Sequence, residues 1–242
     1  MTAASPNLVL SVKKLSLSFA HRTILEDLNF EVARGENLAI IGPNGAGKTV
    51  LLRALLDQLA YKGSIEWDPE AKVGYVPQSI AADRQLPLQV SDLLAAKARL
   101  LKLPDGAVWR TAAFVGLGAE LLAARIGVLS GGQFQKAMIT FALLGDPNVL
   151  LVDEPTASLD ELAQEHIYEL LEKLRQERNL TVLLVSHDLS VVYQFATKVL
   201  CLSKGKLCFG SPQDVLTPDT LAAVYSAVPK FYQHAHQHNV KE

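Results

Sequence analysis

The sequence has no run of apolar residues long enough to cross a membrane. The longest candidate, residues 137–152, is interrupted by Gly145, Asp146 and Pro147, whereas a membrane-spanning helix needs about 18 or more apolar residues. The N-terminus also lacks the positive segment and apolar stretch of a secretory signal. These absences argue against a membrane-embedded or secreted chain, so we expect the protein to stay in the cytoplasm.

A strong charge of either sign is missing as well. The 23 Lys and Arg residues nearly balance the 25 Asp and Glu residues, for a formal net charge of -2. Binding to nucleic acid requires a concentrated basic surface, so we expect no nucleic acid as a partner. Apolar residues are plentiful, at 49% of 242 residues. This supports a core large enough for one domain with an inserted subdomain.

Cysteine is scarce, with only Cys201 and Cys208 in the chain. They flank a turn-like segment, residues 203–206, and would face each other across a tight hairpin. A disulfide is geometrically conceivable, but a reducing cytosol disfavours it. We therefore expect two packed thiols.

The sequence does contain a phosphate-binding loop, the pattern G-x-x-x-x-G-K-[ST], at residues 42–49. An apolar strand at residues 38–41 precedes it. Glycines let the backbone curl so that N–H groups point at phosphate oxygens, and the following helix adds its positive end. Lys48 is expected to neutralise the β- and γ-phosphates and Thr49 to give its hydroxyl to Mg²⁺. The helix after the loop is predicted from apolar residues on one face: Leu51, Leu52, Leu55, Leu56 and Leu59.

A β-rich start and an inserted helical block surround this loop. Residues 8–12 and 28–32 predict an antiparallel layer within residues 8–36, with Phe19 in its loop. Phe19 has two interpretations, stacking on an adenine ring or packing in the core. Short strands are predicted at residues 64–67 and 73–76, and helical spacing runs from about residue 91 to residue 145. This block is an insertion, because the next strand that ends in Asp comes only at residues 149–153.

A second helix start lies inside the insertion. Residues 129–133 form a turn of small residues before a helix predicted over residues 134–144. Its backbone amides could cradle another phosphate. The alternative is an ordinary N-cap turn.

Two further strands end in chemically active residues. The strand at residues 149–153 ends in Asp153 and Glu154, and the strand at residues 181–185 is followed by His187. An amphipathic helix is predicted between them. The carboxyl ends of parallel strands are where doubly wound α/β folds bind ligands. A carboxylate pair and a histidine are therefore predicted beside the phosphate loop.

With these residues the chain resembles the ATP-binding cassette (ABC) ATPases over about residues 8–215. The resemblance implies an α/β fold: a P-loop NTPase core with a parallel sheet, an N-terminal antiparallel β layer and an inserted α-helical subdomain. It implies a single domain over residues 1–242. Its core would be residues 8–85 and 146–215, its helical subdomain residues 86–145, and its C-terminal extension residues 216–242.

The resemblance also assigns roles to the site residues. Gln78 matches the glutamine that senses magnesium and the attacking water, Asp153 holds magnesium through water, and Glu154 is the general base or water-orienting residue. His187 matches the switch histidine at the γ-phosphate. The catalytic set is Lys48, Gln78, Glu154 and His187, and the metal set is Thr49, Gln78 and Asp153.

Nucleotide contacts follow from the same comparison. Phe19 matches the aromatic residue on adenine. Residues 129–133 match the signature that touches the γ-phosphate bound by a partner subunit, and Asp160 belongs to a loop that crosses the dimer interface. The implied ATP-binding set is Phe19, Gly42, Pro43, Asn44, Gly45, Ala46, Gly47, Lys48, Thr49, Val50, Ser130, Gly131, Gly132, Gln133 and Asp160. Phosphoryl transfer to water requires charge neutralisation, metal placement and an oriented water. Lys48 would provide the first, Thr49 and Asp153 with Mg²⁺ the second, and Glu154 the third.

The helix after the signature departs from the family pattern. Lys136 and Phe141 stand where arginine is usual. Lys136 keeps a charge without the guanidinium fork, and Phe141 keeps none. Some contacts between this helix and the core of a typical member are therefore in doubt.

The resemblance implies the ATPase subunit of a transporter, bound at the cytoplasmic face of the cell membrane. Expected partners are transmembrane permease subunits, a second copy of the chain as a homodimer and, indirectly, a periplasmic or extracellular solute-binding protein. Segments at residues 73–78, 86–88, 199–202 and 210–212 resemble zinc and manganese uptake ATPases. The alternatives are an importer of another solute, a soluble ABC ATPase of an assembly or repair machine, and a non-catalytic nucleotide-dependent scaffold.

The C-terminal tail adds a separate hypothesis. His234, His236 and His238 stand at alternate positions, and imidazole suits Zn²⁺, Ni²⁺ and Cu²⁺. The tail is interpreted either as a metal-binding segment or as a polar solvated end.

Overall fold

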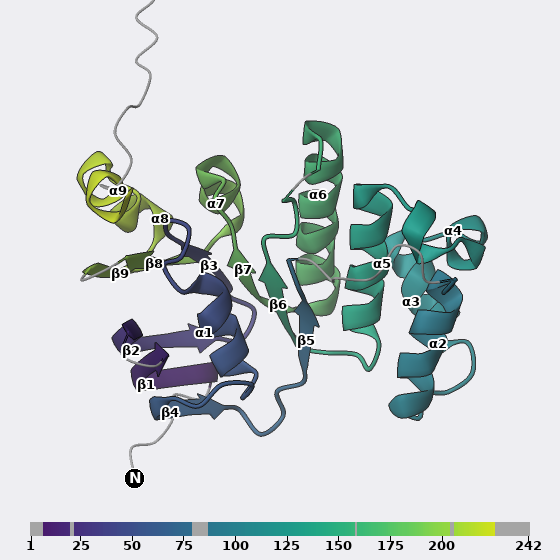
Figure 1. Ribbon diagram of the computed structural model, residues 1–242, viewed down its shortest axis with the longest axis horizontal. Helices are drawn as coiled ribbons and strands as arrows, with labels where there is room; N and C mark the ends of the chain where they lie inside the picture. Colours follow the sequence, from purple (N-terminus) through teal and green to yellow (C-terminus); the bar gives the residue numbers. More distant parts are fainter. Residues whose placement is uncertain (1–6, 20–21, 79–86, 158, 204–205, 226–242) are drawn as a thin grey trace, which may run out of the picture.

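The computed structural model describes residues 7–19, 22–78, 87–157, 159–203 and 206–225. Ser158 and the three tail histidines lie outside these residues. The described residues form two sheets with helices packed around them (Figure 1). The α/β architecture with an antiparallel N-terminal sheet confirms the predicted fold class. No helix in the described ranges is long and apolar enough to span a bilayer.

The antiparallel sheet has the order β2-β1-β4, from β1 (Leu8–Phe19), β2 (Arg22–Ala33) and β4 (Lys62–Trp67). Each of the first two strands has 12 residues, so the predicted strands at residues 8–12 and 28–32 were too short. Phe19 pairs with Arg22 at the end of β1, and its predicted place in a loop was wrong. The polar residues between the apolar runs stay in the ladder by pairing across the strands and by β-bulges.

The second sheet has the order β5-β6-β7-β3-β8-β9. Its strands are β3 (Asn37–Ile41), β5 (Val73–Val76), β6 (Val149–Asp153), β7 (Thr181–Val185), β8 (Lys198–Ser203) and β9 (Lys206–Gly210). The first five strands are parallel and β9 is antiparallel. All residues of β3, β6 and β7 are buried, which explains why these strands are continuous apolar runs. The carboxyl ends of β6, β7 and β3 therefore lie side by side, as predicted.

Helix α1 (Lys48–Leu55) follows β3, and α6 (Glu161–Arg178), α7 (Leu189–Phe195), α8 (Pro212–Val215) and α9 (Pro218–Tyr225) follow later strands. Helix α1 ends at Leu55 because the chain turns at Asp57, whose φ is +56°. Leu59, predicted on the helix face, therefore lies beyond the helix, although it still packs against the core.

The inserted block consists of α2 (Val90–Leu100), α3 (Ala107–Val115), α4 (Ala119–Ala123), the 3₁₀ turn η1 (Ile126–Val128) and α5 (Gly131–Leu143). These helices gather beyond β5, on the side of the sheet away from α1 (Figure 1). Helix α5 contacts α2, α3, α6 and β5. It begins at Gly131 rather than at the predicted residue 134, because Ser130 caps it.

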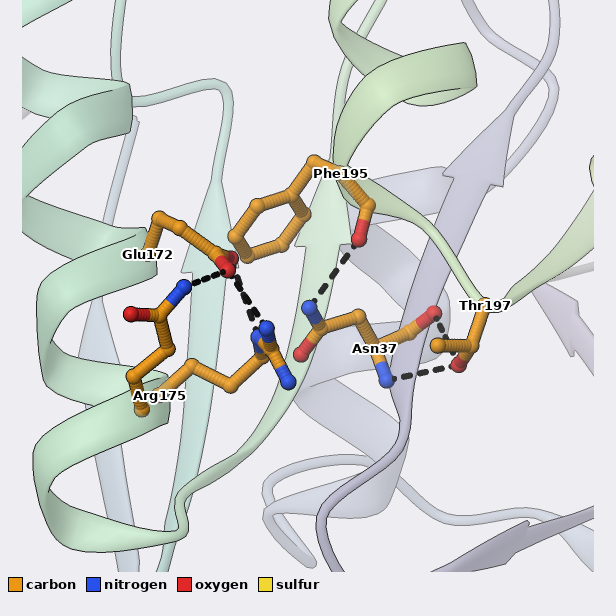
Figure 2. A network of polar contacts seen from close by, with 6 residues as sticks. Asn37, Glu172, Arg175, Phe195 and Thr197 are labelled. Carbon is orange, nitrogen blue, oxygen red and sulfur yellow. Dashed lines mark hydrogen bonds and ion pairs between the residues drawn. The ribbon is translucent and has the colours of Figure 1, made fainter.

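Strand β3 is fixed at its amino end by two hydrogen bonds, one buried and one partly buried (Figure 2). Asn37 donates from its backbone N–H to Thr197 Oγ1 at 2.9 Å and from Nδ2 to the Phe195 carbonyl at 3.0 Å. Figure 2 also shows the Phe195 ring beside Glu172 of α6, which accepts hydrogen bonds from Arg175. The strand that leads into the phosphate loop is thus held to the end of α7 and to the turn before β8.

The two cysteines lie opposite each other in the hairpin of β8 and β9. Their Cα atoms are 4.9 Å apart, and a disulfide joins them. The prediction that they face each other is confirmed, but the prediction of two packed thiols is wrong. The antiparallel register alone brings them within the Cα separation that a disulfide spans, about 4.4–6.8 Å.

Candidate functional site

The phosphate loop turns sharply where β3 ends. Gly42 has a φ of +149°, and a Cβ atom there would lie 2.1 Å from the Leu202 carbonyl oxygen of β8. Gly47 precedes α1 with a φ of +100°, and a Cβ there would touch Ile24 and Leu25 of β2. Glycine is therefore required at both ends of the loop.

Lys48, the first residue of α1, folds back over the loop. Its Nζ donates a hydrogen bond to the Gly42 carbonyl at 2.9 Å and lies 3.4 Å from the Pro43 carbonyl. It also lies 3.5 Å from Glu154 Oε1. The Lys48 side chain is 6% exposed, so a buried positive charge lies within the loop.

Glu154 follows β6 in an unusual backbone conformation. Its φ is +43°, which costs a non-glycine residue about 1–3 kcal/mol. Its N–H donates to the Val185 carbonyl of β7 at 3.1 Å. Its carboxylate accepts a 2.8 Å hydrogen bond from Gln78 Nε2 at the end of β5. The structure therefore brings together three predicted catalytic residues, Lys48, Gln78 and Glu154.

Asp153 is the most deeply buried carboxylate of the site, at 1% exposure. Neither of its carboxylate oxygens has a hydrogen-bond partner among the described residues. Burial raises the pKa of Asp153 and neighbouring Glu154 adds to the rise, whereas the nearby Thr49 hydroxyl, Lys48 and Arg53 lower it. The Thr49 hydroxyl thus faces Asp153 without a hydrogen bond of ordinary geometry. Two unpaired buried oxygens suit a hard cation, which prefers oxygen ligands.

Two residues beside Asp153 were not predicted. Tyr75 of β5 has a raised pKa, first through burial and then through the Asp153 charge, and Arg53 of α1 lowers that pKa. Arg53 stands one helical turn after Thr49, so the helical period of α1 alone would have indicated it. Tyr75 depends on the pairing of β5 with β6, which the sequence does not reveal.

His187 follows β7 and is exposed. A capping role was the alternative for a polar residue at this turn, but Asp188 caps α7 by accepting hydrogen bonds from the N–H groups of Ser190 and Val191. Burial raises the pKa of Asp188, but the hydrogen bonds from Ser190 and Val191 and the nearby His187 outweigh it and lower the pKa. The imidazole of His187 therefore stays exposed at the carboxyl edge of the sheet.

The signature segment forms a capping box in this chain. The Gln133 N–H donates to Ser130 Oγ at 3.3 Å, and the Ser130 N–H donates to Gln133 Oε1 at 2.9 Å. Asp160 caps α6 in a similar way, accepting from the Ala163 N–H at 2.8 Å. Figure 1 shows α5 and α1 on opposite sides of β5 and β6. The signature and the phosphate loop of one chain are thus not brought together.

Phe19 is the remaining residue that was expected to contact the nucleotide. Phe19 is 47% exposed at the end of β1.

The two residues that depart from the family pattern lie on α5. Phe141 contacts Lys97 of α2: Lys97 Nζ donates a hydrogen bond to the Phe141 carbonyl at 2.6 Å and lies 4.4 Å from the centroid of the Phe141 ring. Burial lowers the pKa of Lys97. Lys136 lines a hollow of about 360 Å³ beside His166 and Lys173.

Comparison with known proteins agrees with this geometry. The family model described as "ABC transporter" matches residues 25–157, and a second model, described as "AAA domain, putative AbiEii toxin, Type IV TA system", overlaps it at residues 123–192. A "Probable metal transport system ATP-binding protein" of Thermotoga maritima is 37% identical and covers 90% of both chains. The "Zinc import ATP-binding protein ZnuC" of Yersinia enterocolitica is 37% identical over 95% of this chain and 92% of its own.

Solved structures show the same fold. A chain from "An inward-facing conformation of a putative metal-chelate type ABC transporter" superposes with a TM-score of 0.83 at 29% identity, over 91% of this chain and 90% of its own. The cbiO1 protein of Clostridium perfringens superposes with a TM-score of 0.77 at 25% identity, over 91% and 97%. This protein is therefore a member of the ABC transporter ATPase family, a nucleotide-binding subunit that hydrolyses ATP.

Proposed function

We propose that this ATPase powers the uptake of a divalent metal ion, zinc or manganese, through an ABC transporter. The proposal rests on the names of two relatives that match this chain over at least 90% of their own length. The Thermotoga maritima relative is named for metal transport and the Yersinia enterocolitica relative for zinc import, and both match at 37% identity. A superposable chain described as metal-chelate type supports the same class of cargo.

In the proposed mechanism, the loop from Gly42 to Val50 binds the phosphates of ATP, and Lys48 neutralises their charge. In the chain described here Lys48 Nζ is held by the Gly42 carbonyl and lies 3.5 Å from Glu154. Phosphate oxygens compete for the same ammonium group. ATP binding is therefore expected to draw Lys48 toward the phosphates and to leave the Glu154 carboxylate free for water.

Glu154 is proposed to orient the attacking water and to accept its proton. The strained backbone at Glu154 and the hydrogen bond from Gln78 fix the direction of its carboxylate. His187, exposed at the end of the neighbouring strand β7, is proposed to contact the γ-phosphate. Phe19, exposed at the end of β1, is proposed to stack on adenine.

The residues beside Asp153 fit Mg²⁺. Asp153 offers buried oxygens that have no hydrogen-bond partner among the described residues, and the Thr49 hydroxyl faces it. We propose that Thr49, Gln78 and Asp153 hold the ion, with Asp153 acting through water. When bound, Mg²⁺ would supply charge neutralisation at the phosphates.

A second copy of the chain is proposed to complete each site. Ser130 and Gly131 are exposed at the start of α5, and Asp160 is exposed at the start of α6. Because α5 lies across the sheet from α1 (Figure 1), the signature is available to the phosphate loop of another subunit. A head-to-tail homodimer would place Ser130, Gly131, Gly132 and Gln133 of one chain at the γ-phosphate of the other.

Permease subunits are proposed to hold this dimer at the cytoplasmic face of the cell membrane. One of their cytoplasmic helices would dock near residues 78–100, where β5 leads toward the helices α2–α5. A solute-binding protein outside the membrane would deliver the metal ion to the permease and would contact the ATPase only indirectly.

The proposal is tested by metal uptake in cells that lack the gene. We expect the wild-type chain to restore accumulation of radioactive zinc or manganese and growth under chelation, and Lys48→Ala to restore neither. Lys72→Ala, which changes an exposed lysine before β5, is the matched control and should behave as wild type.

The alternatives predict different outcomes. Restored uptake of another solute, with zinc and manganese unchanged, would make the protein an importer of that solute. Purification of the tagged chain with soluble proteins and without a membrane protein would favour an assembly or repair machine. Full uptake by Lys48→Ala would contradict ATP-driven transport by this subunit.

A further inference from the structure

Tyr225, the last residue of α9, has a buried hydroxyl group that the mechanism above does not use. Its Oη atom has no hydrogen-bond partner among the described residues. Leaving a buried hydroxyl unpaired is unfavourable, so the surroundings of this atom point to a function. Its ring packs against the cluster that includes Ile41, the residue immediately before the phosphate loop.

Helix α9 is anchored to the strand that supports the loop. Ser203 Oγ at the end of β8 donates a 3.2 Å hydrogen bond to the Val224 carbonyl, one residue before Tyr225. Strand β8 in turn packs closely against Gly42, the first residue of the phosphate loop: a Cβ atom at Gly42 would lie 2.1 Å from the Leu202 carbonyl oxygen. Gly42 is therefore enclosed by β8 on one side, and α9 is tied to the same strand (Figure 1).

The Tyr225 hydroxyl faces the backbone of Gly42. Burial raises the pKa of Tyr225, and an interaction with the Gly42 backbone opposes this rise. A backbone group that lowers the pKa of a phenol does so as a donor to its oxygen. The Tyr225 hydroxyl is buried and has no hydrogen-bond partner among the described residues, so its oxygen is free to accept a hydrogen bond from this part of the loop.

We propose that Tyr225 is a positioning residue for nucleotide binding, whose hydroxyl accepts a hydrogen bond from the Gly42 N–H when the phosphate loop closes on ATP. The carbonyl of Gly42 already holds Lys48. A hydrogen bond at the Gly42 N–H would restrain the backbone of Gly42, and with it the carbonyl that anchors the lysine. The C-terminal helix would in this way set nucleotide affinity from outside the motifs of the loop.

The test is the Tyr225→Phe variant of the full chain, which removes the hydroxyl and keeps the ring. Losing one neutral hydrogen bond corresponds to a 2- to 10-fold change, about 0.5–1.5 kcal/mol. We expect the Kd for MgATP and MgADP, measured by calorimetry, and the KM for MgATP to rise about 2- to 10-fold, with kcat changed less than about 2-fold. The matched control is Tyr193→Phe, because Tyr193 is 53% exposed on α7.

A merely structural role gives a different result. Partial unfolding would lower kcat through loss of active protein and leave KM unchanged. Unchanged Kd and KM in Tyr225→Phe would overturn the proposal, as would equal effects in Tyr193→Phe. If Tyr225→Phe does not fold, Ser203→Ala carries the test: loosening α9 should raise KM at least about 2-fold, and an unchanged KM would overturn the proposal.

The inference rests on nucleotide binding at the site proposed above, and the same experiment separates the two. Failure of the wild-type chain to bind MgATP would contradict the proposed function itself. Tight binding by wild type together with equal binding by Tyr225→Phe would contradict only the role of Tyr225.

Discussion

Gln78 donates a 2.8 Å hydrogen bond to Glu154, although the two residues are 76 positions apart in the sequence. The bond joins the end of β5 to the end of β6, across the junction from which the chain runs on toward the inserted helices. Movement of that junction would therefore shift or break the hydrogen bond to the proposed catalytic carboxylate. If a permease docks near Gln78, as proposed above, this hydrogen bond would link its movement to the carboxylate of Glu154.

The first prediction concerns the Glu154 carboxylate. Glu154→Gln should keep ATP affinity, because Lys48 and the loop remain, but lower the rate of hydrolysis by at least about 10², the scale of a lost general base. Single-turnover hydrolysis with the purified chain measures the effect. Glu161→Gln, which changes an exposed carboxylate at the start of α6, is the control. Hydrolysis near the wild-type rate in Glu154→Gln would remove this residue from the mechanism.

The second prediction concerns the stability of the nucleotide-free protein. Burial raises the pKa of Asp153, so its charged form destabilises the folded chain at neutral pH. Asp153→Asn should therefore raise Tm by about 2–4 °C for each 1 kcal/mol relieved, while it abolishes hydrolysis that depends on Mg²⁺. Differential scanning calorimetry and an ATPase assay measure the two effects.

The sign of this effect can be checked with pH. A carboxyl whose folded pKa is raised gives stability that is fully present only below its unfolded value, about 3.9 for Asp. The advantage of Asp153→Asn should therefore shrink as the pH falls from 7 toward 4. Asp105→Asn, an exposed substitution between α2 and α3, should show no such trend. A Tm below wild type at pH 7 would mean that Asp153 is stabilised by contacts absent from the structure.

The third prediction separates the two kinds of glycine in the chain. Gly42→Ala places a Cβ against the Leu202 carbonyl at a φ of +149°, so it should weaken ATP binding about tenfold or more and destabilise the chain by more than about 1 kcal/mol. Gly118→Ala is the matched control, because Gly118 has a φ of -73° and nothing within 4 Å. Calorimetric ATP titration and thermal melts of both variants test this. Equal behaviour of the two would contradict the close packing of the loop against β8.

Much of this site was predictable because its parts are local. The phosphate loop is a contiguous motif, and Asp153, Glu154 and His187 each follow a continuous apolar run that has to be a buried strand. Parallel pairing of β6 with β7 and of β7 with β3 then brings them to one edge. The sequence left two interpretations of Ser130 open, a phosphate-binding turn and an N-cap. The structure shows the capping box that an N-cap forms.

The remaining contacts depend on register and on distant segments. The position of Tyr75 beside Asp153 requires the pairing of β5 with β6, and that of Tyr225 beside Gly42 requires α9 to return to β8. The disulfide between Cys201 and Cys208 was missed for another reason: the compartment argument outweighed a hairpin geometry that was itself predicted correctly. Sequence periodicity does not resolve such pairings.

The last prediction distinguishes the two roles of Ser130. As an N-cap, Ser130 stabilises α5, so Ser130→Ala should cost about 0.5–2 kcal/mol in thermal unfolding of the nucleotide-free chain. Ser211→Ala is the matched control, because Ser211 caps the short helix α8 through a hydrogen bond of the same length, 3.3 Å, from the Asp214 N–H.

The second role of Ser130 is tested by dimerisation. If Ser130 also contacts the γ-phosphate bound to a second chain, only Ser130→Ala should weaken the ATP-dependent dimer formed by Glu154→Gln, as measured by light scattering. Ser130→Arg should prevent that dimer, since it adds bulk and a positive charge that has to be desolvated. A full dimer in Ser130→Arg, or a monomer in Glu154→Gln at saturating ATP, would leave Ser130 as a helix cap alone.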